Sequence, residues 1–97
     1  MSLWNLLLRD ARVSLMEGEL QRTLGRNLRA YRKSHDLSQE NFAEIMGVHR
    51  TYMGGVERGE RNLTLRSLER MAKRIEIDPL DLLRPSDENG QAPRPDP

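Results

Sequence analysis

Apolar residues recur along the chain at helical spacing, and capping or turn residues separate the apolar stretches. The first clear stretch holds Leu20, Leu24, Leu28 and Tyr31, at i, i+4, i+8 and i+11 of one helix face. This spacing predicts a first helix of about 15 residues. Arginines occupy its other faces, so only one side is expected to be buried.

The next two helices are predicted to be short and closely spaced. Ser38 is a good N-cap for the second helix, in which Phe42, Ala43 and Met46 form an apolar face. Gly47 suits the left-handed position that follows a helix. The linker to a third helix is very short, and two helices joined by so short a linker must cross at a steep angle.

Two further helices complete the pattern. Thr64 can cap a fourth helix, and Asp78 followed by Pro79 repeats the start signal for a short fifth helix. The fourth helix is expected to bury Leu65, Leu68, Met71, Ala72 and Ile75, and the fifth holds Leu80, Leu82 and Leu83. No stretch alternates with period two for long enough to indicate a sheet. The sequence therefore predicts an all-α, compact five-helix domain over residues 20–83.

The two ends of the chain differ from this domain. Trp4, Leu8 and Leu15 lie at i, i+4 and i+11, so residues 1–19 are interpreted either as an N-terminal helical extension or as partly a cloning remnant. Residues 84–97 hold four of the five prolines and almost nothing apolar. They are predicted to form a disordered acidic tail.

Charge is unevenly distributed behind a net charge of +1. Residues 20–75 carry twelve Lys or Arg residues against six Asp or Glu residues, whereas residues 1–19 and 76–97 are net acidic. The chain has no cysteine, which excludes disulfides, thiolate zinc sites and a cysteine nucleophile. No signal peptide or membrane span is expected, so the cytoplasm is the predicted compartment.

Gly54 and Gly55 stand inside the third helix, where each costs about 1 kcal/mol relative to alanine. On a helical wheel they share a side with Arg50, Thr51 and Arg58, opposite the apolar residues. Glycines on this side would let another molecule approach the helix closely. The alternative interpretation is that the pair only marks a frayed helix.

A capped helix, a tight glycine turn and a second helix in basic surroundings indicate a helix-turn-helix. In such a unit the second helix enters the major groove of DNA, and the first lies across the phosphates. Arginine is the natural reader of guanine O6 and N7, and threonine can contact a thymine methyl or a phosphate. Arg50 is therefore the first predicted base reader, and Thr51 is the second.

The segment SQENFAEIMGVHRTYMGGVERGERNLTLRSLERMA resembles the Xre/lambda-repressor-like helix-turn-helix family, and the resemblance covers about residues 20–83. The HRTY, GGVERG and RNLTL pieces are similar to controller proteins of restriction-modification systems. The resemblance implies a lambda-repressor-like fold, a phosphate contact from Gln39 and base contacts from Arg50 and Thr51. The family usually has a small hydroxyl residue where His49 stands, which leaves the cap of this helix open.

These observations give a set of predicted DNA contacts. The predicted base contacts are Arg50, Thr51 and Gly55, and the predicted backbone contacts are Gln39, His49, Tyr52, Arg58, Arg61 and Asn62. Tyr52 also faces the apolar side, where core packing competes with a phosphate contact. Glu57 and Glu60 flank the arginines and are expected to form solvated or intramolecular ion pairs worth under about 1 kcal/mol.

Other functions find less support in the sequence. His35 and His49 are the only histidines, and neither shares a helix face with a serine and a carboxylate or with a second metal ligand. No catalysis, metal or cofactor is therefore expected. The main alternative is a protein-binding module on the same fold, such as an antitoxin, whose acidic tail would fold on a basic partner.

One such module reads only a few base pairs, so a homodimer on an inverted repeat is expected, with recognition helices about 34–36 Å apart. The candidate dimer contacts are Leu80, Leu82 and Leu83, or Trp4 and Leu8 of the N-terminal stripe. The predicted function is transcriptional regulation by occupancy. Bound near a promoter, the dimer would block or recruit RNA polymerase.

Overall fold

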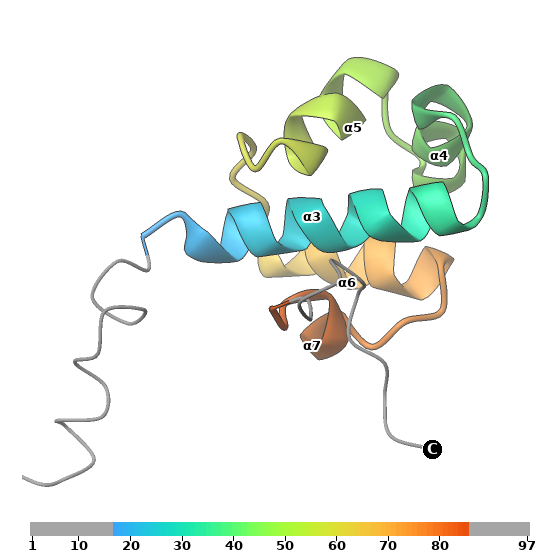
Figure 1. Cartoon of the computed structure of the whole chain (residues 1–97). Coiled ribbons are helices and arrows are strands. Elements are labelled where there is room, and N and C mark those ends of the chain that lie inside the picture. The colour runs from blue at the N-terminus through green and yellow to red at the C-terminus, as the bar shows by residue number, and fades with distance from the viewer. Residues whose placement is uncertain (1–16, 86–97) are drawn as a thin grey trace, which may run out of the picture.

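The computed structural model describes residues 17–85. Within this range the chain is all-helical, with five helices: α3 (Glu19–Ser34), α4 (Gln39–Met46), α5 (Arg50–Glu57), α6 (Leu65–Arg74) and α7 (Pro79–Leu82). Helix α3 runs through the middle of the domain, with α4 and α5 on one side and α6 and α7 on the other (Figure 1). The predicted five-helix fold is confirmed. The predicted N-terminal stripe and nearly all of the predicted tail lie outside the described residues.

The helix boundaries follow the predicted capping residues. The Ser38 hydroxyl accepts a hydrogen bond from the Asn41 backbone N–H at 3.0 Å, and Thr64 and Asp78 cap α6 and α7 in the same manner. Gly47 has a φ of 72°, so it ends α4 in the left-handed conformation that favours glycine. These four boundary predictions are confirmed. None of the described helices is long and apolar enough to cross a membrane.

The core takes residues from one face of each helix. Its buried members are Leu24, Leu28, Phe42, Ala43, Met46, Met53, Val56, Leu68, Met71, Ala72, Ile75 and Leu82. Leu65 was predicted to belong to this set, but it is 77% exposed. It is the first residue of α6 and lines a surface hollow instead of the core.

Helix α7 is fastened to α3 by a buried amide. The Asn27 side chain donates hydrogen bonds to the backbone carbonyls of Leu82 at 2.8 Å and Arg84 at 2.7 Å. Leu82 is only 1% exposed, so the domain buries this candidate dimer contact in its own core. Leu80, two residues earlier, is 64% exposed and remains available.

Gly25, which sequence reasoning passed over, sets the distance between α3 and α5. A Cβ atom at this position would lie 2.5 Å from the backbone carbonyl oxygens of both Val56 and Glu57. Real side chains do not tolerate such a distance to a backbone atom. Glycine is therefore required here because the end of α5 packs directly on the backbone of α3.

We predict that Gly25→Ala destabilises the domain by at least about 2 kcal/mol, because the methyl group forces two packed helices apart. The measurement is urea unfolding followed by circular dichroism. Gly54→Ala is the matched control, since its Cβ would meet only side-chain atoms of Arg58 and Gln39. Equal stability of Gly25→Ala and the parent chain would contradict the close helix contact.

Candidate nucleic-acid interface

Helices α4 and α5 form the predicted helix-turn-helix. The turn between them is closed by a hydrogen bond from the Val48 N–H to the Ala43 carbonyl at 3.0 Å. Only three residues, Gly47 to His49, separate Met46 at the end of α4 from Arg50 at the start of α5. A turn this short keeps the two helices side by side, which is what a helix-turn-helix requires.

His49 caps α5 with its imidazole ring. Its Nδ1 accepts a hydrogen bond from the Thr51 backbone N–H at 3.0 Å, and its backbone is extended, as an N-cap requires. An accepting Nδ1 carries no proton, so the ring hydrogen of the neutral side chain lies on Nε2. The imidazole ring thus supplies the cap that the sequence left open.

Arg50 and Thr51 are both exposed at the first turn of α5. The Arg50 side chain is 62% exposed, and its nearest carboxylate partner is Glu40, with 4.0 Å between Nη1 and Oε2. An exposed ion pair this long contributes little free energy and is easily exchanged. Arg50 can therefore leave Glu40 for another acceptor.

The predicted open glycine surface on α5 is wrong. Gly54 and Gly55 are both buried, although they lie on the side of α5 that the wheel indicated. A Cβ at Gly54 would lie 3.1 Å from Nη1 of Arg58 and 3.3 Å from Oε1 of Gln39. At Gly55 the nearest atom would be Nε of Arg61, at 2.9 Å.

Three side chains that were predicted to contact the DNA backbone therefore cover the two glycines. Without Cβ atoms, α5 lets the side chains of Gln39, Arg58 and Arg61 lie flat against its backbone. Gly55 itself is not presented for a base contact while Arg61 lies over it. The glycines serve to seat neighbouring polar groups.

Glu57 forms an intramolecular ion pair, which is one of the two predicted arrangements, but the pair is buried. Its carboxylate accepts from Nε of Arg32 at 2.9 Å and from Nη2 of Arg32 at 3.2 Å, and its side chain is only 3% exposed. Arg32 also donates to the Leu37 carbonyl at 3.1 Å, and Gln39 Nε2 donates to Glu57 at 3.2 Å. Helical periodicity gave no signal for this cluster because its members come from three different segments.

Glu60 behaves as the sequence predicted. Its carboxylate accepts from Nε of Arg58 at 3.1 Å, and both side chains are about 60% exposed. This pair is screened by solvent and leaves Arg58 free to exchange partners.

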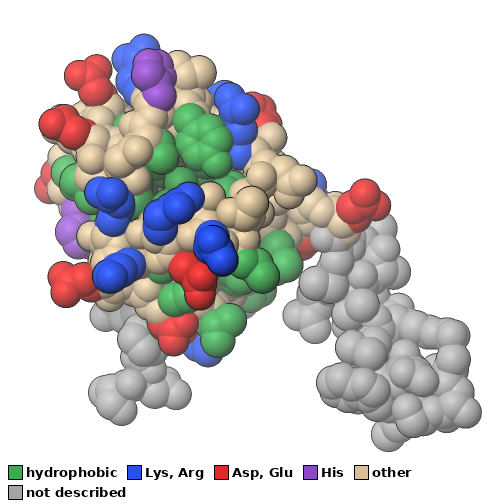
Figure 2. All heavy atoms as spheres, turned by 180° about the vertical axis from the view of Figure 1, so that it is seen from behind, with side chains coloured by type: hydrophobic (Ala, Val, Ile, Leu, Met, Phe, Trp, Pro, Cys, Tyr) green, Lys and Arg blue, Asp and Glu red, His purple; other side chains and the backbone are tan. Residues whose placement is uncertain are grey.

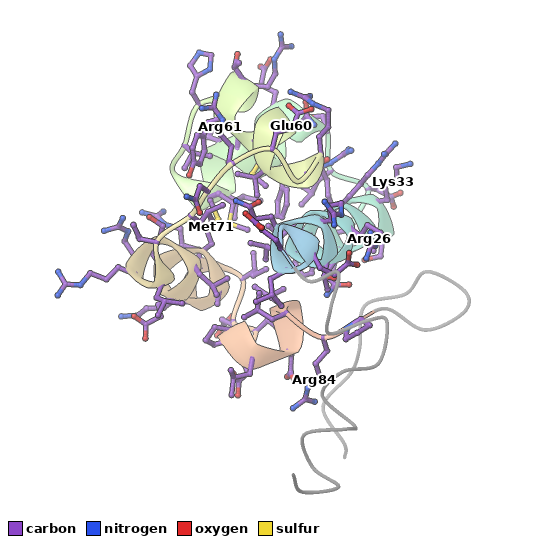
Figure 3. The ribbon with its side chains drawn as sticks, turned by 90° about the vertical axis from the view of Figure 1, so that its left-hand side faces the viewer. Arg26, Lys33, Glu60, Arg61, Met71 and Arg84 are labelled. Atoms are coloured by element: carbon purple, nitrogen blue, oxygen red, sulfur yellow. The ribbon has the colours of Figure 1, made fainter. Side chains whose placement is uncertain are left out.

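The loop after α5 is held against the rest of the domain. The Gln21 amide donates to the Arg61 backbone carbonyl at 3.0 Å and to Oδ1 of Asn62 at 3.4 Å. The Arg61 guanidinium lies 5.2 Å from the centre of the Tyr52 ring, which is itself partly buried against the core. Figure 3 shows Arg61 and Glu60 at the α5 end of the domain, far from Arg84.

Basic side chains gather on the face shown in Figure 2, around an apolar patch. Part of the surface of α6 is a hollow whose lining includes Tyr52, Arg70 and Arg74.

No group of three or more His, Asp or Glu side chains within residues 17–85 is placed to hold a metal ion. His35 stacks on Tyr31 with 4.0 Å between the ring centres, and its Nδ1 lies 2.9 Å from the Tyr31 carbonyl oxygen.

Comparison with known proteins agrees with this geometry. A helix-turn-helix family model matches residues 28–82, and the chain belongs to that family. It is 48% identical over 66 residues to control protein C.SmaI of Serratia marcescens, a match covering 68% of this chain and 76% of the relative. It is 36% identical to control protein C.BamHI of Bacillus amyloliquefaciens, covering 70% of this chain and 85% of the relative.

A solved structure resembles the fold as well. The restriction-modification controller protein C.AhdI from Aeromonas hydrophila superposes with a TM-score of 0.59 and 38% identity, covering 67% of this chain and 94% of that one. The protein is therefore a helix-turn-helix DNA-binding transcriptional regulator. The resemblance to the Xre-type family and its controller proteins is confirmed.

We predict that His49→Ala destabilises the domain by about 1 kcal/mol, because the Thr51 N–H loses its capping acceptor. His49→Ser should retain most of the stability, since a serine hydroxyl can accept the same hydrogen bond. Urea unfolding followed by circular dichroism measures the free energy of unfolding of both variants. Equal losses for alanine and serine would show that the ring acts by packing and not by capping.

Proposed function

We propose that this protein is a controller-type transcriptional regulator that binds an inverted-repeat DNA operator as a homodimer. The observation that carries the proposal is the capped N-terminus of α5, where Arg50 and Thr51 stand exposed with no strong partner. In this arrangement the first turn of α5 enters the major groove, and Arg50 donates two hydrogen bonds to guanine O6 and N7. Thr51 contacts a neighbouring base or phosphate.

The surrounding side chains supply backbone contacts. Gln39 lies at the start of α4, and Arg58 and Arg61 lie at the end of α5 and in the following loop. With His49, Tyr52 and Asn62 they rim the two ends of the recognition helix. Contacts of this kind fix the register of the helix on the duplex and carry no sequence information themselves.

An apolar surface away from α5 supports self-association. Leu65 and Leu80 are 77% and 64% exposed, and Leu20 is 49% exposed. Leu20, Leu65 and Leu83 also line a hollow of about 210 Å³ between α3 and α6. These exposed leucines, two of which line the hollow, favour burial against a second copy. A twofold dimer would place two α5 helices about 34–36 Å apart. They would then enter two successive turns of the major groove on the same side of the duplex.

The proposed mechanism is occupancy of a promoter in the cytoplasm, where the bound dimer blocks or recruits RNA polymerase. The controller relatives support this interpretation over an enzyme. The antitoxin alternative uses the same fold for protein contacts, and it does not require Arg50 to read a base. Arg50 is therefore the residue on which the two functions differ.

We predict that the purified protein enriches an inverted repeat from a pool of random duplexes, and that Arg50→Ala loses the preference at one base pair in each half-site. The expected loss is about 1–3 kcal/mol per half-site, because each bidentate arginine contact to guanine is of that size. Arg29→Ala, which removes an exposed arginine of α3, is the matched charge control and should keep the preference. No enrichment at low salt would favour the protein-binding alternative.

We predict that Leu65→Glu and Leu80→Glu each raise the dimer dissociation constant at least about tenfold, since burying one leucine is worth about 1.5–3 kcal/mol. Both residues lie in the first turn of a helix, where a carboxylate is well tolerated. Sedimentation velocity measures the dimer. Ile45→Gln alters an exposed apolar residue of α4 and serves as control. Unchanged dimers in both glutamate variants would place the interface elsewhere.

A further inference from the structure

The Gln39 amide is held between two parts of α5. Its Nε2 donates to Oε1 of Glu57 at 3.2 Å, and its Oε1 lies over Gly54, 3.3 Å from where a Cβ would stand. Gln39 is half-buried, so part of its side chain still reaches the surface at the start of α4. One part of the Gln39 amide is therefore held inside the domain by Glu57, and another part is accessible from the surface.

The Glu57 carboxylate decides which way the amide points. An ionised carboxylate only accepts hydrogen bonds, and both oxygens of Glu57 already accept from Arg32. If the Gln39 amide flipped, its carbonyl oxygen would face an acceptor in a nearly dry site, which is unfavourable. The amide is therefore locked with its nitrogen toward Glu57. Because Nε2 carries two hydrogens, the bond to Glu57 leaves one N–H for a further acceptor.

We propose that Glu57 and Gly54 are positioning residues for DNA binding, which orient Gln39 so that it donates its remaining N–H to one DNA phosphate. This inference rests on the proposed function. Glu57 fixes the polarity of the amide, and Gly54 leaves room for it against α5. The buried ion pair with Arg32 thus acts on the DNA contact through Gln39, without touching DNA itself.

The glycine at position 54 distinguishes positioning from a purely structural role. Alanine is the better helix former, so a structural role alone predicts that Gly54→Ala leaves stability unchanged or raised. A Cβ there would however press on Gln39 at 3.3 Å and on Arg58 at 3.1 Å, which must shift. If Gly54 positions Gln39, the Gly54→Ala variant is at least as stable as the parent protein but binds DNA more weakly.

The test uses the inverted repeat enriched by the parent protein, with single phosphates replaced in turn by neutral methylphosphonates. Fluorescence anisotropy gives the affinity of each duplex for the parent chain and for Gln39→Ala. One replacement should weaken the parent about three- to tenfold, as expected for one phosphate hydrogen bond, and should have no effect on Gln39→Ala. If no replacement loses its effect in Gln39→Ala, Gln39 makes no phosphate contact and the inference is overturned.

The positioning residues are then tested on that same duplex. Glu57→Gln and Gly54→Ala should both lose sensitivity to the replacement that depends on Gln39, and both should keep the base preference conferred by Arg50. Glu57→Gln should also keep the other phosphate sensitivities, whereas Gly54→Ala also loses any sensitivity that depends on Arg58, because its Cβ displaces that side chain. Glu69→Gln makes the same chemical change as Glu57→Gln at an exposed site on α6, and it should behave as the parent.

The outcomes separate the inference from the proposed function. Persistent sensitivity in Glu57→Gln and Gly54→Ala overturns the positioning role, while DNA reading by α5 stands. If Glu57→Gln fails to fold, Gly54→Ala, which keeps the ion pair, decides alone. Failure of the folded parent protein to enrich any duplex overturns the proposed function, and the inference falls with it.

Discussion

The ion pair between Arg32 and Glu57 is the interaction on which the helix-turn-helix half of the domain depends. It joins α3 to the last residue of α5, and through Gln39 it also reaches the first residue of α4. A buried carboxylate without its partner is strongly unfavourable, so the pair must form whenever α5 packs on α3. Its directional hydrogen bonds then fix the helices in rotation as well as in distance.

Gly25 adds a steric constraint to this electrostatic one. The carbonyl oxygens at the end of α5 rest directly on the α3 backbone, which leaves no room for even a methyl group. Apolar packing alone would permit α5 to slide, since cores accept many arrangements of similar volume. The glycine contact and the ion pair together hold α5, the recognition helix, at one position along α3 and in one orientation.

Local signals in the sequence predicted the fold well. Capping residues and the Gly47 turn act within a few residues, so Ser38, Thr64 and Asp78 could be recognised without knowledge of neighbouring helices. The errors arose where distant segments meet. A helical wheel gives the side of α5 on which Gly54 lies, but it does not show which side chains reach across to cover it.

The same limit explains the remaining differences. The burial of Glu57 could not be predicted because its partner, Arg32, lies 25 residues earlier in the chain. Leu80 and Leu82 are chemically identical, and only the position of α7 against Asn27 decides that one is exposed and the other buried. Exposure of Arg50 and Thr51 was predictable, since both belong to the first turn after a recognisable helix boundary.

The imidazole cap changes the kind of group that α5 presents at its tip. A serine or threonine cap leaves a small hydroxyl that both donates and accepts. With Nδ1 occupied by the Thr51 N–H, the neutral His49 ring has only its Nε2–H to offer, and the ring holds that donor farther from the backbone than a hydroxyl would be. The recognition helix is thereby lengthened by one rigid planar group that is compatible with a phosphate oxygen and incompatible with a base-edge donor.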